Sequence, residues 1–183
     1  MIVKTALLAC GVDRAFAVFT AEASVWWPAE CRHTGDADST IVMEASGRFY
    51  ERSRDGEEIE LGRVRVWEPP HRLVLDWYPG TDPEHPTEVT VAFAAEGSGT
   101  RITIEHRSLP ASEALWRDRA ARYDASWDRV LAAVGRRDRI GERQRRLAHA
   151  RRADQKRVRA ALQPAAEEYV ELGVPTGREV AGE

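Results

Sequence analysis

A series of short strand patterns followed by one long amphipathic segment constrains the fold of this chain most. Between Thr40 and Arg107, apolar and polar residues alternate over short stretches, and Asp55-Gly56 is typical of a hairpin turn. Between Pro110 and Val134, large apolar residues recur every three or four positions, as on one face of a helix. This order predicts an α+β fold in which a curved antiparallel sheet packs against a long C-terminal helix, with room for a cavity between the layers.

The strand patterns divide the first part of the chain into seven expected strands. They cover residues 2–10, 40–45, 47–53, 59–67, 72–78, 88–94 and 100–107. Between the first two, Asp13 is positioned to cap a helix that carries Phe16 and Phe19. A second short helical piece carries Trp26-Trp27 and ends at Pro28, and a polar loop follows up to Ser39.

Charge is distributed unevenly along the chain. The whole sequence has 27 basic and 30 acidic residues, yet between Arg136 and Arg159 there are 11 basic and 3 acidic residues. This stretch favours a helix, although Gly141 is expected to interrupt it. We therefore expect a domain at 1–135 and an Arg-rich helical extension at 136–183, with a frayed terminus from Gly173. The extension is either a solvated helix, a docking segment for nucleic acid or an acidic partner, or, with least support, a membrane-surface helix.

The sequence argues against several classes of protein. Its two cysteines, Cys10 and Cys31, lack the spacing of a disulfide framework or a zinc site, and His33 adds no second ligand pair. Leu7-Leu8-Ala9-Cys10 resembles a lipoprotein cleavage box, but the apolar stretch before it is shorter than a signal peptide requires. No apolar run approaches the ~18 residues of a membrane span. We expect a cytoplasmic protein without a metal or cofactor.

An ordered set of motifs extends over residues 1–135. The motifs are Phe16-x-x-Phe19-Thr20, Trp26-Trp27-Pro28, Gly47-Arg48-Phe49-Tyr50-Glu51-Arg52, Gly62-Arg63-Val64, Trp67-Glu68-Pro69-Pro70-x-Arg72-Leu73-Val74, Gly99-Thr100-Arg101-Ile102-Thr103-Ile104-Glu105-His106 and Tyr123-Asp124-x-x-Trp127-Asp128-x-Val130-Leu131. Together they resemble the START-like helix-grip (SRPBCC) superfamily and, within it, bacterial relatives of the activator of the Hsp-ninety ATPase. The resemblance implies a sheet that grips the C-terminal helix around an apolar cavity, which in superfamily members holds lipids, hormones or polyketides. It does not identify a ligand here.

The inward-facing stripe of the sheet and the apolar face of the helix supply the expected cavity lining. The expected lining residues are Trp27, Phe49, Leu73, Leu75, Trp77, Val89, Val91, Phe93, Ile104, His106, Trp116, Tyr123 and Trp127. Each of them alone is better explained as packed core than as cavity lining. As a set, the large aromatic rings suit a flat or greasy small molecule.

Two polar residues are weak catalytic candidates. Alternation places His106 on the face of Ile102 and Ile104, where its ring either reaches the cavity as a proton shuttle or is hydrogen-bonded structurally. Glu51 shares a face with Phe49 and would need a partner if buried. If the two side chains converge in the cavity, a general acid/base pair becomes possible.

The expected activity is therefore binding of a small apolar or aromatic ligand between the sheet and the C-terminal helix. One alternative is a cyclase- or dehydratase-type enzyme acting on a polyketide-like substrate, which requires the convergence of His106 and Glu51. Another is a co-chaperone or adaptor that stimulates a chaperone ATPase. An exposed interaction surface in place of a deep cavity would favour the adaptor.

Overall fold

The computed structural model describes residues 1–162, so the expected frayed terminus from Gly173 lies outside the described part. The elements are β1 (Ile2–Leu8), α1 (Val12–Phe19), α2 (Ala23–Trp26), the 3-10 turn η1 (Ala29–Cys31), β2 (Thr40–Met43), β3 (Arg48–Arg52), β4 (Glu58–Glu68), β5 (Arg72–Trp77), β6 (Thr87–Glu96), β7 (Gly99–Ser108), the 3-10 turn η2 (Pro110–Ser112) and α3 (Glu113–Leu162).

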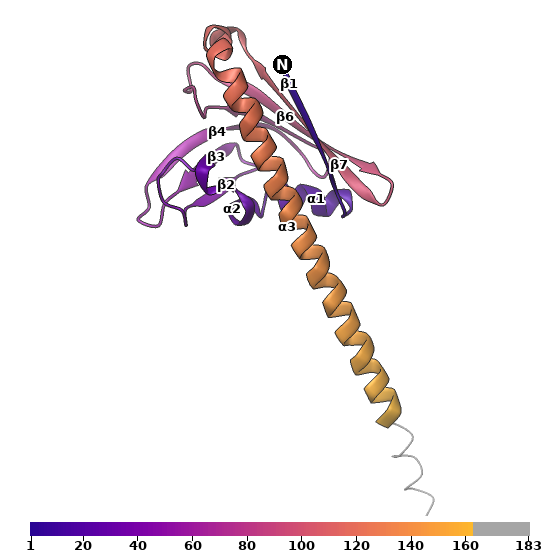
Figure 1. Ribbon diagram of the computed structural model, residues 1–183. Helices are drawn as coiled ribbons and strands as arrows, with labels where there is room; N and C mark the ends of the chain where they lie inside the picture. The colour runs from indigo at the N-terminus through magenta and orange to yellow at the C-terminus, as the bar shows by residue number, and fades with distance from the viewer. Residues whose placement is uncertain (163–183) are drawn as a thin grey trace, which may run out of the picture. The chain divides into compact units, whose positions relative to one another are not determined.

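The seven strands form one antiparallel sheet in the order β1-β7-β6-β5-β4-β3-β2. Strands from β2 to β7 pair with their neighbours in sequence, whereas β1 pairs with the last strand, β7. The N-terminal part of α3 runs across one face of this sheet (Figure 1). The α+β helix-grip fold predicted from the sequence is confirmed.

The sheet curves at β4. The pairing register shifts between Phe49 and Tyr50 on β3 and between Val64 and Val66 on β4, which locally increases twist and bend. At the same place Gly62 lets two strands approach closely, because a Cβ added there would lie 2.1 Å from the carbonyl oxygen of Asp76. The glycine is therefore required by the curvature of the sheet.

The core lies between the sheet and α3. Leu73, Val91 and Ile104 occupy matched positions on β5, β6 and β7, and all three are buried. The apolar face predicted for the long helix is also confirmed. Its buried members are Tyr123, Trp127, Val130, Leu131 and Val134, and Trp116 is partly buried against the core.

The prediction that Asp13 caps the first helix is wrong. Gly11, and not Asp13, is the N-cap of α1, and its carbonyl accepts the first helical hydrogen bond from Ala15 N at 2.9 Å. Asp13 lies in the first helical turn, where its carboxylate still interacts favourably with the helix dipole. The cap is set by the backbone that leaves β1, so a side-chain rule could not locate it.

Gly141 does not interrupt the last helix, contrary to expectation, since α3 is continuous from Glu113 to Leu162. The turns before it are held by the domain. Arg137 pairs with Glu22 at 2.7 Å, and the carboxylate of Asp138 accepts a hydrogen bond from Ala9 N at 2.7 Å. These contacts offset the helix penalty of a glycine, which is about 1 kcal/mol relative to alanine.

Contacts divide the chain into a compact unit, Met1–Glu142, and a second unit, Arg143–Glu183. The change in composition at 135/136 comes before Arg137 and Asp138, which contact Glu22 and Ala9. In the second unit, all side chains at 143–159 are exposed. Within residues 1–162 no helix is long and apolar enough to cross a membrane.

Candidate functional site

Three tryptophans from separate parts of the chain meet under α3. The ring centroid of Trp77, at the end of β5, lies 5.0 Å from that of Trp127 on α3. Trp27, which directly follows α2, stacks against Trp77 at 6.2 Å. Phe49 of β3 also packs against this group, and its ring centroid lies 5.6 Å from that of Trp77. Such rings provide a large apolar surface with defined orientation.

A cavity of about 310 Å³ opens beside these rings, within the unit Met1–Glu142. It is bounded by the segment around η1, by the end of β5 with the loop that follows, and by α3. Its lining consists of Trp27, Glu30, Cys31, His33, Trp77, Pro79, Gly80, Arg122, Tyr123, Ser126, Trp127, Arg129 and Val130. The volume lies at the lower end of the range for small-molecule sites.

The structure brings four of the thirteen expected lining residues to this cavity, namely Trp27, Trp77, Tyr123 and Trp127. The other nine are not part of its lining. Phe49, Leu73, Leu75, Val89, Val91, Phe93, Ile104 and His106 are buried in the core, and Trp116 is partly buried. Strand alternation identifies the face on which a side chain lies, but not whether helix or cavity covers that part of the strand.

His106 is completely buried and holds two walls of the cavity in place. Its Nδ1 accepts a hydrogen bond from Trp127 Nε1 at 3.0 Å, so Nε2 carries the proton and donates to Thr87 Oγ1 at 2.8 Å. The Thr87 hydroxyl in turn donates to the Trp77 carbonyl at 3.2 Å. Burial, followed by the charge of the chain's N-terminus, lowers the pKa of His106 to about 3. This arrangement is that of a neutral, structurally bonded histidine.

Glu51 is also fully buried, but its partners belong to the loop after η1. Its carboxylate accepts hydrogen bonds from His33 N at 2.6 Å, from the Thr34 hydroxyl at 2.6 Å and from the Ser39 hydroxyl at 2.6 Å. Burial raises the pKa of Glu51, but these donors outweigh it and leave the pKa below its ordinary value. Glu51 thus anchors the loop that carries Cys31 and His33 to the cavity.

His106 and Glu51 therefore act in different places. Each uses its polar atoms on its own set of partners, and neither lines the cavity. The general acid/base pair considered above would need both side chains at the cavity surface.

Polar residues outside the thirteen expected lining positions form the rim. Arg122, Ser126 and Arg129 follow one another at helical spacing, directly beside the stripe of Tyr123 and Trp127. That spacing is a signal available in the sequence. Pro79 and Gly80 belong to the loop after β5, and Glu30, Cys31 and His33 reach the rim from η1 and its loop. The positions of Cys31 and His33 depend on the hydrogen bonds between their loop and Glu51, which no local sequence pattern predicts.

Cys31 is the one thiol on the cavity wall among the described residues. Burial, followed by the negative charge of Glu30, raises the pKa of this thiol above its ordinary value, although Arg129 acts in the opposite direction. Because the thiolate is the nucleophilic form, Cys31 is a poor candidate for covalent catalysis at neutral pH.

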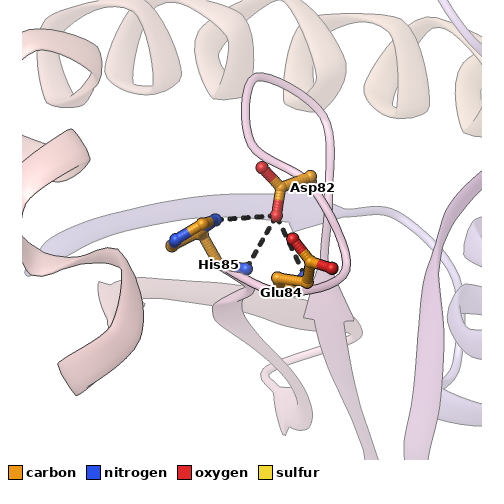
Figure 2. A group of neighbouring side chains, drawn as sticks. All are labelled: Asp82, Glu84 and His85. Atoms are coloured by element: carbon orange, nitrogen blue, oxygen red, sulfur yellow. Dashed lines mark hydrogen bonds and ion pairs between the residues drawn. The ribbon is translucent and has the colours of Figure 1, made fainter.

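Figure 2 shows the acidic group on the loop between β5 and β6. Asp82 Oδ1 accepts hydrogen bonds from the backbone nitrogens of Glu84 and His85, both at 2.9 Å, and lies 2.8 Å from His85 Nδ1. These three residues offer one ligand atom each within 4.8 Å of one another, but Asp82 and Glu84 are exposed. The hydrogen bonds within the group explain it as a turn that stiffens the loop after Gly80.

Comparisons with known proteins agree with this architecture. The sequence profile described as "Activator of Hsp90 ATPase homolog 1-like protein" matches residues 9–133. The chain belongs to this family. The family lies in the START-like helix-grip superfamily, as the motifs of the sequence suggested. No curated protein matches the sequence.

Solved structures extend the comparison. CalC from Micromonospora echinospora, described as a self-sacrificing resistance protein, is 27% identical with a TM-score of 0.59, over 75% of this chain and 92% of CalC. DynU16, from the dynemicin biosynthetic locus, shares 18% identity and a TM-score of 0.51, over 76% of this chain and 47% of DynU16. Txn09, described as an anthrahydroquino-gamma-pyrone synthase, is 28% identical with a TM-score of 0.48, over 74% and 94% of the two chains.

Proposed function

We propose that this member of the Hsp90-activator-like family binds a small aromatic molecule non-covalently in the cavity under α3. The observation that carries the proposal is the cavity of about 310 Å³ with Trp27, Trp77, Tyr123 and Trp127 in its wall. An aromatic ligand would exchange water for ring contacts on several sides, and such contacts are favourable in a largely preformed site.

Family membership and the similarity to CalC support a role that involves a small molecule, either by binding or by cyclase-type chemistry. The site geometry favours binding. The acid/base pair on which the cyclase alternative depends, His106 and Glu51, does not line the cavity, and burial raises the pKa of the Cys31 thiol. The adaptor alternative rests on the description of the family, and the aromatic wall of the cavity favours a ligand instead.

A titration with the neutral fluorescent probe N-phenyl-1-naphthylamine tests the proposal. We expect saturable binding that Ser126→Phe abolishes, because the new ring occupies the cavity from a half-buried lining position. Ala125→Phe is the matched control, since residue 125 is exposed on the same helix and does not line the cavity. Equal binding by both variants would contradict the proposal, as would absence of saturable binding to the native protein.

A specific observation favours a second activity in the unit Arg143–Glu183. Arg145, His149, Arg152, Lys156 and Arg159 follow one another at alternating intervals of four and three, so they form one row along α3, and all five are exposed. The row extends over roughly 21 Å. We propose that this basic row binds the phosphate backbone of a nucleic-acid duplex. Residues 143–159 of α3 lack the bulky apolar face of a membrane-surface helix and the aromatic residues used to stack single strands.

A further inference from the structure

Two polar groups in the cavity wall have no hydrogen-bond partner within residues 1–162. Trp77 Nε1 and Tyr123 Oη are buried and form no hydrogen bond, and each residue is only 7% exposed. A buried donor without an acceptor is unfavourable, so native proteins pair nearly all of them. Both residues line the cavity, which makes its contents the available source of an acceptor.

Thr81 is the polar neighbour of Tyr123. The Thr81 hydroxyl donates to the carbonyls of Tyr78 and Trp77, at 3.1 and 3.4 Å, and forms no hydrogen bond with Tyr123 Oη. Gly80 covers the phenol closely, because a Cβ added at Gly80 would lie 3.1 Å from Tyr123 Oη. Trp77 Nε1 is a donor only, so an acceptor on a ligand satisfies it and a second donor does not.

The rim adds a positive charge to this donor pair. Arg122 and Arg129 line the cavity seven residues apart on α3, about 10 Å along the helix axis, with Ser126 between them. Neither forms an ion pair with another residue in the described part of the chain. Glu30 is the one carboxylate in the lining, so the two guanidinium groups are in excess. Guanidinium groups on an exposed rim bind carboxylates with defined geometry.

Resting on the proposed binding function, we infer that the ligand is a planar aromatic acid with a carbonyl-type acceptor in its ring system. Trp77 Nε1 and Tyr123 Oη donate to the ring acceptor within the cavity, and Arg122 and Arg129 pair with the carboxylate at the rim. This ligand satisfies both orphan donors and places its charge where solvent still screens it. A purely apolar ring would leave both donors unpaired.

Four probes of one shape separate these contributions: fluorene, 9-fluorenone, fluorene-2-carboxylate and 9-fluorenone-2-carboxylate. We expect 9-fluorenone-2-carboxylate to bind most tightly in a titration followed by tryptophan fluorescence. Tyr123→Phe keeps the ring and removes its hydroxyl, and Trp77→Phe replaces the indole by a smaller apolar ring without a donor. Each should weaken 9-fluorenone-2-carboxylate about 5-fold more than fluorene-2-carboxylate, the effect of one hydrogen bond.

The rim is tested with the same probes. Arg122→Gln with Arg129→Gln should weaken both carboxylates about 10-fold and leave the neutral pair unchanged, whereas Arg117→Gln, on an exposed position outside the cavity, should change nothing. Equal losses for fluorenone and fluorene probes would overturn the donor assignment, and equal losses for acids and neutral probes would overturn the arginine assignment. Binding of the four probes with equal affinity would contradict this inference while the proposed function stands. Failure of every aromatic probe, N-phenyl-1-naphthylamine included, would overturn both.

Discussion

Burial of His106 makes the stability of this protein depend on pH. The pKa of its ring is lowered to about 3, chiefly by burial, while an unfolded histidine titrates at its ordinary value of 6.5. Between these two values the unfolded chain binds a proton that the folded protein does not. The resulting stability is therefore complete above pH 6.5 and is lost as pH falls from 6.5 toward 3.

We predict that the free energy of unfolding, measured with urea, decreases by about 2 kcal/mol between pH 6.5 and pH 4.5. His106→Gln should flatten this dependence, whereas His149→Gln, on an exposed position, should preserve it. In an NMR titration the His106 ring should keep the chemical shifts of the neutral form down to pH 5. A ring that titrates near 6.5 would contradict the assignment of the Trp127–His106–Thr87 hydrogen bonds.

At the scale of elements, the seven strands and the long helix could be predicted because alternation and helical spacing report which face of an element is buried. Trp77, Tyr123 and Trp127 were identified as lining residues in this way, and they do line the cavity. Leu73, on the same face of β5 as Trp77, packs into the core instead. The difference lies in what covers each end of the strand, and that depends on distant parts of the chain.

The bend of the sheet at Gly62 leads to a second prediction. Gly62→Ala should lower the free energy of unfolding by about 1–3 kcal/mol, because its Cβ would meet the rigid carbonyl of Asp76 and the strands would have to separate. Gly11→Ala is the control, since a Cβ at Gly11 meets nothing within 4 Å. Urea denaturation of the two variants measures the difference, and equal stability would show that the curvature does not depend on this glycine.

The basic row of α3 leads to a third prediction. Replacing Arg145, Arg152 and Arg159 by Gln should weaken binding to a 20-base-pair duplex at least 10-fold in fluorescence anisotropy. The matched triple variant, at Arg143, Arg151 and Arg157, removes the same charge from the other side of the helix and should weaken it less. For the native protein, a plot of the logarithm of the association constant against the logarithm of the salt concentration should have a slope of about −4. Equal losses would contradict a specific row, and binding only to acidic proteins would replace the duplex as partner.

At the scale of the whole molecule, the position of the boundary between the two units has a measurable consequence. Removal of residues 143–183 should leave cooperative unfolding and probe binding unchanged, because the contacts of Arg137 and Asp138 remain. Removal from residue 136 onward deletes both contacts and should cost about 1–3 kcal/mol. Urea denaturation of the two shortened chains distinguishes the positions. Equal stability of both would place the end of the domain at residue 135.

The cavity itself is a property of the whole molecule, and this limits what its sequence could predict. Its aromatic wall follows from strand and helix patterns. Its polar rim depends on a loop held by Glu51 and on the Gly80 turn, both of which become neighbours of α3 only in the folded chain. His106 was correctly placed on the inner face, but its hydrogen-bond partners lie 19 and 21 residues away in sequence.

Native mass spectrometry of the purified protein tests the central claim most directly. The claim predicts a complex with 9-fluorenone-2-carboxylate in a ratio of one ligand to one chain, present with Ala125→Phe and absent with Ser126→Phe. A protein that remains empty with each of the aromatic probes, or that binds several copies equally in both variants, would contradict a single aromatic site under α3.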